Sequence, residues 1–295
     1  MSEKIDLKAY RKESPMDYVK AIKLINKDPK NYIIPHTIYK ITRLHIPETI
    51  YKYYSFTNDE ELNRIKLDTI KNQKVYLAES SLMNDPFEGK AFFYDNTKLS
   101  KYKRLQHCDG MLVDDFSKFI KLTSFTAKSV NCMPMWAHYA NNHAGFCIAY
   151  DTSKNIRLKA NLFPVQYTEE RIDITGIMDN FIKELHENIE YCKVNNIKEI
   201  KVENLILLWI SIYYSCIKHK SWSYENEIRC IIGKNTIKDS YMDAKPSAIY
   251  IGINCEDLRK KELFDIAYEL DIPLYQMYFD YKSYKYELGY FQINR

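Results

Sequence analysis

The chain has 295 residues, which is enough for one large domain or two small ones. Hydrophobic residues make up 46% of it, so a substantial apolar core is expected and wholesale disorder is excluded. The formal net charge is +4, a mild excess that neither requires nor excludes a nucleic-acid partner. Only 7 glycines occur, and no Gly-x-Gly-x-x-Gly or Gly-x-x-x-x-Gly-Lys run is present, so the glycine loops of Rossmann and P-loop enzymes are not expected.

The spacing of cysteine and histidine argues against both a disulfide framework and a metal site. The 7 cysteines are an odd number, include no Cys-x-x-Cys pair and follow no secretory signal, so we expect reduced thiols in a cytoplasmic protein. The closest candidate ligands, Cys132, His138, His143 and Cys147, lack zinc-type spacing, and no metal is expected. The longest apolar run, 205–214, is too short to span a bilayer, so no membrane association is expected.

The elements, taken in chain order, predict a short extension followed by one domain. Residues 1–48 are polar, with prolines as punctuation, and predict an N-terminal helical extension of one or two short helices. Residues 49–295 predict a single α+β domain. Runs rich in β-branched and aromatic residues predict strands at 50–56, 75–78, 121–126, 145–150, 228–232, 248–253 and 273–280. Helical spacing predicts helices at 62–70, 96–119, 135–142, within 177–220, and at 257–270.

This order of elements predicts the fold class. Strands and helices alternate irregularly, without the strict βαβ repeat of a parallel sheet. We therefore expect a mixed, mostly antiparallel, split sheet with helical insertions. The strands at 51–56, 121–126 and 227–232 each end beside polar motifs, so we expect them to line one cleft, bordered by the turn-forming residues 84–88.

The most informative local pattern is Glu225-Asn226-Glu227, which runs directly into an apolar strand. If that strand extends back through both acids, their side chains point to the same face. Two like charges held so close raise the pKa of at least one of them. Such a pair is typical of a site that grips a cationic or polar group, or performs acid–base work. The alternative is an edge strand with two solvated glutamates and Arg229 as a neighbour.

Four segments together resemble a widespread bacterial family that is catalogued as a domain of unknown function. The resemblance implies a link to phage defence, because members of the family lie near phage-defence genes. It extends over about residues 50–280, and the four motifs occur in the same order. The segments are Tyr51-Lys52-Tyr53-Tyr54-Ser55-Phe56, Asn84-Asp85-Pro86-Phe87-Glu88, residues 135–148 (MWAHYANNHAGFCI) and Trp222-Ser223-Tyr224-Glu225-Asn226-Glu227-Ile228-Arg229.

The order of motifs also resembles the ADP-ribosyltransferase fold, in which three strands build an NAD site. Residues 51–56 resemble the first strand, 123–126 the middle motif, and 225–227 the Glu-x-Glu motif. The sequence departs from that pattern at two places. Lys52 or a neighbouring tyrosine stands where Arg or His is usual, and Phe125 stands where a hydroxyl residue is usual.

The resemblance implies NAD as substrate and assigns roles to individual residues. Glu227 would stabilise the positive charge that develops on the ribose when nicotinamide leaves, and Glu225 would orient or deprotonate the attacking nucleophile. Ser124 would hold Glu227 or the ribose by a hydrogen bond, and Tyr53 or Tyr139 would stack on nicotinamide. The residues predicted to contact NAD are Lys52, Tyr53, Asn84, Ser124, His138 and Tyr139.

Three functions remain open on the sequence. The first is an NAD-dependent ADP-ribosyltransferase toxin of phage defence, with RNA or DNA favoured over protein as acceptor and with an antitoxin partner. The second is a metal-dependent nuclease that uses Asp85, Glu88, Glu225 and Glu227. The third is a non-catalytic sensor or binding module. A bound nicotinamide nucleotide, a divalent ion between the acid motifs, or a filled pocket would separate them.

Overall fold

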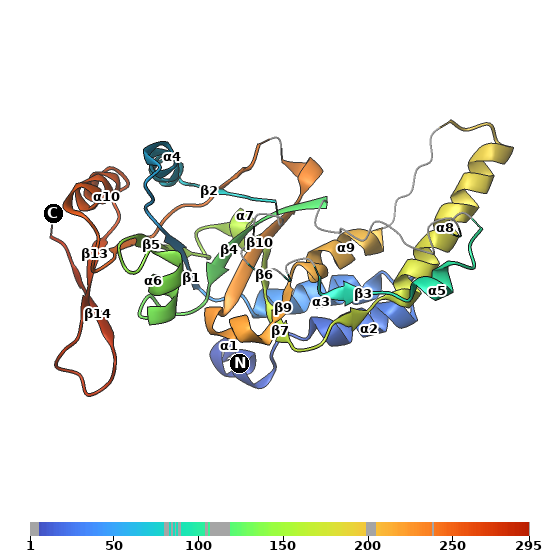
Figure 1. Ribbon diagram of the computed structural model, residues 1–295, viewed down its shortest axis with the longest axis horizontal. Helices are drawn as coiled ribbons and strands as arrows, with labels where there is room; N and C mark the ends of the chain where they lie inside the picture. The colour runs from blue at the N-terminus through green and yellow to red at the C-terminus, as the bar shows by residue number, and fades with distance from the viewer. Residues whose placement is uncertain are drawn as a thin grey trace, which may run out of the picture.

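The computed structural model describes residues 6–79, 83, 85, 87, 90–103, 106, 119–198, 205–237 and 239–294. In this part of the chain, eight strands form one large sheet in the order β14-β13-β12-β5-β1-β4-β10-β6 (Figure 1). Its neighbouring strands are antiparallel except for β12 and β13, which are parallel. The predicted mixed, mostly antiparallel sheet with several helices is therefore confirmed.

Six of the seven strands predicted from β-branched and aromatic runs lie in the large sheet, and the seventh, at 75–78, overlaps a strand outside it. The strands of the large sheet are β1 (Thr49–Tyr54), β4 (Ile120–Thr126), β5 (Phe146–Asp151), β6 (Leu162–Pro164), β10 (Glu227–Gly233), β12 (Ala248–Ile251), β13 (Leu274–Phe279) and β14 (Leu288–Gln292). Three two-stranded sheets accompany it among the described residues. They pair β11 (Tyr241–Asp243) with β2 (Lys74–Tyr76), β3 (Phe92–Phe93) with β8 (Ile172–Asp173), and β7 (Gln166–Thr168) with β9 (Ile217–His219).

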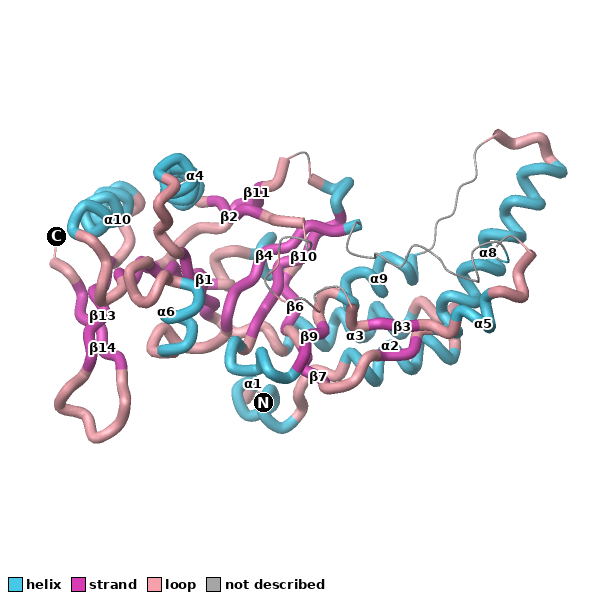
Figure 2. Tube along the Cα trace, viewed as in Figure 1, coloured by secondary structure: helices cyan, strands magenta, loops and turns pink. Residues whose placement is uncertain are grey.

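Helices pack against these sheets, and Figure 2 distinguishes the helices (cyan) from the strands (magenta). The helices are α1 (Leu7–Glu13), α2 (Tyr18–Lys27), α3 (Ile33–Leu44), α4 (Glu60–Lys71), α5 (Asn96–Leu99), α6 (Met133–Tyr139), α7 (Ile156–Ala160), α8 (Thr175–Val194), α9 (Leu205–Tyr214) and α10 (Asp257–Glu269). Helix α5 covers only the start of the helix predicted at 96–119, because residues 100–103 are not helical; residues 104–105 and 107–118 lie outside the described part. No helix among the described residues has the length and apolarity needed to cross a membrane.

The N-terminal extension differs from its prediction of one or two short helices. Its described part forms three helices, and the longest of them, α3, has 12 residues. Helix α2 places Ile22 in one buried cluster with Ile177 of α8 and Ile210 of α9. Because the extension shares this core with α8 and α9, long-range packing contributes to the stability of its helices.

Two apolar cores lie on opposite faces of the sheet around β5. Successive side chains of a strand point to opposite faces. Phe146 and Ile148 accordingly belong to the core that Ile70 of α4 enters, whereas Cys147 belongs to the core that Trp136 of α6 enters. Helices α4 and α6 therefore cover opposite faces of the same strands.

The sheet opens between β1 and β4. These strands pair at a single register position, Tyr51 with Thr126, whereas β4 and β10 pair at seven. Beyond that position, Ala78 exchanges two backbone hydrogen bonds of 2.8 and 2.9 Å with Leu122. The side chain of Lys52 enters the opening and donates to the backbone oxygen of Ser124 at 3.1 Å. The sheet is thus continuous across this seam but loosely paired there, rather than split in two as predicted.

Candidate functional site

A cavity of about 750 Å³ lies at the opening between β1 and β4. Its size falls within the range of small-molecule sites, which hold about 300–1,000 Å³. Helices α4 and α6, strand β9 and strand β10 complete its walls. Seven of the eight residues predicted for the site line this cavity: Lys52, Tyr53, Ser124, His138, Tyr139, Glu225 and Glu227. The eighth, Asn84, lies outside the described residues, as does Glu88, while Asp85 also lines the cavity.

Glu227 is the first residue of β10, and its carboxylate is buried between two cations. Arg229 donates from Nε to Oε1 at 2.7 Å and from Nη2 to Oε2 at 3.1 Å, and the Lys218 ammonium lies 3.3 Å from Oε2. Burial raises the pKa of Glu227, but Arg229, Lys218 and a hydrogen bond from the Ser124 side chain outweigh it and lower the pKa to about 2. Glu227 is thus ionised throughout the neutral range.

Glu225 does not lie on the same strand as Glu227, which corrects the simplest expectation. It ends a 3₁₀ helix, η4 (Lys220–Glu225), and β10 begins only at Glu227. Between them, Asn226 has φ 44° and ψ 53°, a left-handed conformation that asparagine tolerates better than most residues. The chain therefore turns between the two acids, and a cation rather than the strand period brings their carboxylates together.

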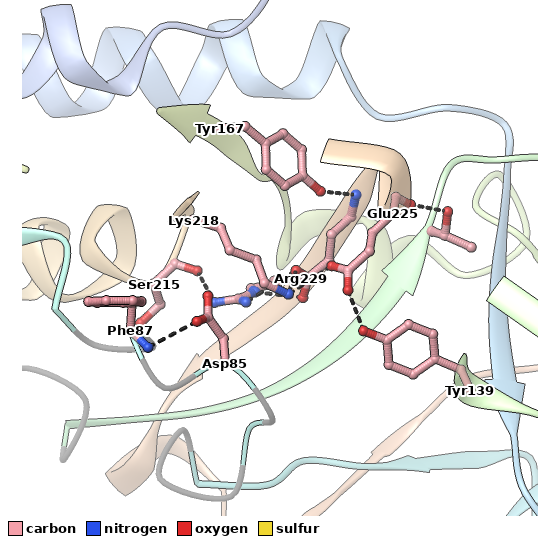
Figure 3. Close-up of polar contacts among 10 residues, drawn as sticks. Asp85, Phe87, Tyr139, Tyr167, Ser215, Lys218, Glu225 and Arg229 are labelled. Atoms are coloured by element: carbon pink, nitrogen blue, oxygen red, sulfur yellow. Dashed lines mark hydrogen bonds and ion pairs between the residues drawn. The ribbon is translucent and has the colours of Figure 1, made fainter. Parts of the chain in front are cut away.

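That cation is Lys218 on β9, a residue that the sequence analysis did not identify. Its Nζ lies 2.7 Å from Oε2 of Glu225 (Figure 3) and 3.3 Å from Oε2 of Glu227. The ammonium also lies 4.6 Å from the centre of the Trp222 ring, a cation–π distance. The only sequence signal for such a residue was indirect, since two buried carboxylates require compensating cations.

The pKa of Glu225 moves in the opposite direction from that of Glu227. Burial and the negative charge of Glu227 raise it, and they outweigh the stabilising contacts that Glu225 receives from Lys218 and Tyr139. The two carboxyl groups consequently differ in how readily each takes up a proton. The alternative of two solvated glutamates on an edge strand is wrong, because both are buried and β10 lies between β4 and β6.

The two aromatic candidates, Tyr139 and Tyr53, have different surroundings. The Tyr139 hydroxyl donates a hydrogen bond to Oε1 of Glu225, so α6 anchors the acid pair directly (Figure 3). Tyr53 is buried with its ring edge-on to Trp136 at 5.1 Å, and its hydroxyl donates to the backbone oxygen of Val130. Either ring was predicted to stack on a ligand. The Tyr53 ring already packs against Trp136 in the core, so Tyr139 is the better candidate.

The remaining candidates surround the acid pair. Lys52 donates to Thr123 Oγ1 at 2.8 Å, and burial lowers its pKa to about 8 despite the nearby charge of Glu227. Ser124 of β4 lines the cavity and stands opposite Arg229 of β10 in the register. His138 is exposed on α6 at the cavity wall, with its ring centre 5.8 Å from that of Tyr224.

The arrangement of charges does not favour the metal-dependent nuclease. A Mg²⁺ site needs carboxylate oxygens that are open to the ion. Here the Lys218 ammonium lies between Glu225 and Glu227, where an ion bridging the two carboxylates would have to lie. Among the residues that the structure describes, no group of three His, Cys, Asp or Glu side chains is placed to hold a metal ion.

Comparison with known proteins gives a match over only part of the chain. No curated protein and no solved structure matches it. A family model described as "Protein of unknown function (DUF2971)" matches residues 135–230. This range starts in α6 and ends in β10, so it contains two of the four motifs, whereas residues 51–56 and 84–88 lie outside it. Over the segment that supplies Tyr139, Lys218, Glu225 and Glu227, the chain is therefore similar to an uncharacterised family.

Proposed function

We propose that the protein binds NAD in this cavity and transfers ADP-ribose to an acceptor on an intracellular macromolecule, as a phage-defence toxin restrained by an antitoxin protein. The observation that carries the proposal is the buried pair of Glu225 and Glu227, with pKa values shifted in opposite directions. Carboxyl groups whose pKa values are driven apart are typical of sites that use one as a fixed charge and the other for proton transfer. The order of motifs, which resembles that of the ADP-ribosyltransferase fold, supports the same function: residues 51–54 lie on β1, 123–126 on β4, and Glu227 begins β10.

Glu227 is assigned to the bond-breaking step. When the bond between the ribose carbon and the nicotinamide nitrogen breaks, its electron pair leaves with neutral nicotinamide and positive charge develops on the ribose. A carboxylate that is already ionised and fixed in place stabilises that charge without reorganising. Arg229 and Lys218 hold Glu227 in this state.

Glu225 is assigned to the bond-forming step. The acceptor oxygen or nitrogen attacks the ribose carbon and must lose a proton. Glu225 in its ionised form takes that proton, and its raised pKa favours holding it afterwards. Lys218 contacts both carboxylates, so it couples the charge of one to the protonation of the other.

The cavity also fits the rest of NAD in chemical character. Lys52 and Lys66 both line it, and two lysines suit the negative charge of a pyrophosphate. With a pKa of about 8, Lys52 is mostly protonated at neutral pH. Tyr139 lies on the same wall and offers a ring against which a planar base can pack.

Release of nicotinamide by the purified protein tests the proposal. Wild type and Glu227→Gln are incubated with NAD labelled in the nicotinamide ring, and free nicotinamide is measured. We expect Glu227→Gln to lower the rate by about 10²–10³, the usual effect of removing one preorganised electrostatic group. Glu187→Gln, on the exposed surface of α8, is the matched control and should release nicotinamide at the wild-type rate.

Two further measurements keep the test decisive. Glu227→Gln leaves Arg229 without its carboxylate, so its melting temperature must establish that it is folded at the assay temperature. Glu225→Gln should retain nicotinamide release while losing transfer to a whole-cell lysate, where nuclease and protease digestion of the labelled product separates nucleic-acid from protein acceptors. Near-wild-type nicotinamide release by folded Glu227→Gln would refute the proposed function.

A further inference from the structure

The loop between β13 and β14 presents three tyrosines to solvent. Its tip has the sequence Tyr281-Lys282-Ser283-Tyr284-Lys285-Tyr286. The exposed areas of the three tyrosines are 90%, 109% and 95% of the reference area of a fully exposed tyrosine. Tyrosine usually buries its ring when a protein folds, because the ring contributes a large apolar area. In Figures 1 and 2 the loop projects away from the sheet, with no other described element beside it.

The charges of the loop are distributed unevenly along it. Asp280 and Glu287 lie at its base, where the Asp280 N–H donates to the backbone oxygen of Glu287 at 3.1 Å. Each acid is also engaged locally: Asp280 accepts from the Lys282 N–H, and Glu287 accepts from the Ser283 hydroxyl at 2.9 Å. The six residues of the tip carry two lysines and no acid, so the tip itself is positive.

A row of tyrosine rings connects this hairpin to the cavity. Tyr290 of β14 lies 5.2 Å from Tyr275, which stacks on Tyr250 at 4.9 Å, and Tyr250 meets Tyr51 at 6.3 Å. Tyr51 lines the cavity. The small Ala149 stands opposite Tyr51 in the register, and Tyr250 is buried, so the row joins the hairpin to the cavity wall as packed side chains.

We propose that the tip of the β13–β14 hairpin binds single-stranded RNA, which makes RNA the acceptor. Only this last step rests on the proposed ADP-ribose transfer. Unpaired bases stack on exposed aromatic rings, and lysines beside those rings meet the phosphates. A duplex hides the faces of its bases, and the centre of a protein interface is depleted in lysine.

Binding of a labelled oligouridylate of about 20 nucleotides, longer than the strand that one small binding domain covers, tests the proposal by fluorescence anisotropy. The triple variant Tyr281→Ala/Tyr284→Ala/Tyr286→Ala of the full chain should bind at least about tenfold more weakly than wild type. The matched control is Tyr191→Ala/Tyr268→Ala, which removes exposed tyrosines from α8 and α10 and should leave the affinity unchanged.

The lysines make a separate, quantitative prediction. Each contact with a single-strand phosphate contributes about 0.7 to the slope of log affinity against log salt concentration. Lys282→Gln/Lys285→Gln should therefore reduce that slope by about 1.4. A loop that merely shapes the hairpin would not change the slope.

Several outcomes would overturn the proposal. They are wild-type affinity in the triple variant, tighter binding of duplex RNA, or tighter binding of single-stranded DNA of the same sequence. Light scattering adds another: if the triple variant converts a dimer to a monomer at unchanged RNA affinity, the tip is a contact between copies of the chain. Nicotinamide release without RNA should be equal in wild type and the triple variant, so failure of RNA binding and failure of the proposed function are distinguishable.

Discussion

The ammonium nitrogen of Lys218 lies 2.7 Å from a carboxylate oxygen of Glu225, and only 8% and 4% of the two side chains are exposed. The pair joins a three-residue strand to the end of a 3₁₀ helix. The free-energy cost of burying two charges is close to the gain from their attraction, whereas removing one partner leaves the other charge buried and unpaired. Loss of Lys218 would therefore destabilise the protein mainly by leaving the buried Glu225 carboxylate without a cation.

Replacing Lys218 by methionine should lower the free energy of unfolding by about 3–5 kcal/mol, the usual cost of breaking a buried ion pair. Urea denaturation at pH 7 measures it. The control is Lys220→Met, because Lys220 pairs with Glu169 at the surface, where a pair contributes about 0–1 kcal/mol. Equal effects of the two substitutions would contradict the importance assigned to Lys218.

The stability of the protein should depend on pH through Lys52. Burial lowers the pKa of Lys52 from its ordinary 10.5 to about 8 in the folded state. Between these values the unfolded chain binds more protons than the folded one, so this lysine's contribution to stability rises as the pH rises from about 8 to 10.5. The free energy of unfolding of wild type, relative to that of Lys52→Met, should therefore increase between pH 7.5 and 10. A difference that stays flat or falls over this pH range would show that the pKa of Lys52 is not lowered in the folded state.

Gly145, between α6 and β5, should tolerate no side chain. A β-carbon there would lie 2.1 Å from the backbone oxygen of Tyr54 and 3.0 Å from the α-carbon of Ala140, and neither atom can move freely. Gly145→Ala should cost about 3 kcal/mol, at the high end for overpacking, and should displace α6 from the cavity wall. At Gly233 the nearest atom would lie 3.5 Å away on a side chain, so thermal denaturation of Gly233→Ala should be close to that of wild type.

Much of the sheet was predictable because its signals are local. The β-branched runs that predicted strands at 121–126 and 228–232 form β4 and β10. The polar residues before α4 act as its N-cap, since Asp59 accepts a hydrogen bond from the Leu62 N–H at 3.0 Å. Such features depend on neighbouring residues along the chain, which a sequence displays directly.

The composition of the site was less predictable because its contacts join distant segments. Lys218 lies on a strand of three residues whose position depends on pairing with β7, and a run that short has no diagnostic period. The left-handed turn at Asn226 changed how the two acids meet. The strand β14 was missed, because turn-forming residues precede it and its pairing with β13 depends on the sheet edge.

The contact between Lys52 and the Ser124 carbonyl has a consequence for how the sheet is closed. Elsewhere along β4 a backbone amide fills this role, and such a bond breaks only if the strand itself shifts. At the seam a flexible side chain fills it, so a change of rotamer at one lysine would free the carbonyl while the register of β4 on β10 stays intact. A bound anion would attract the same lysine, so the contact at the seam can be exchanged while the strand pairing of the sheet is kept.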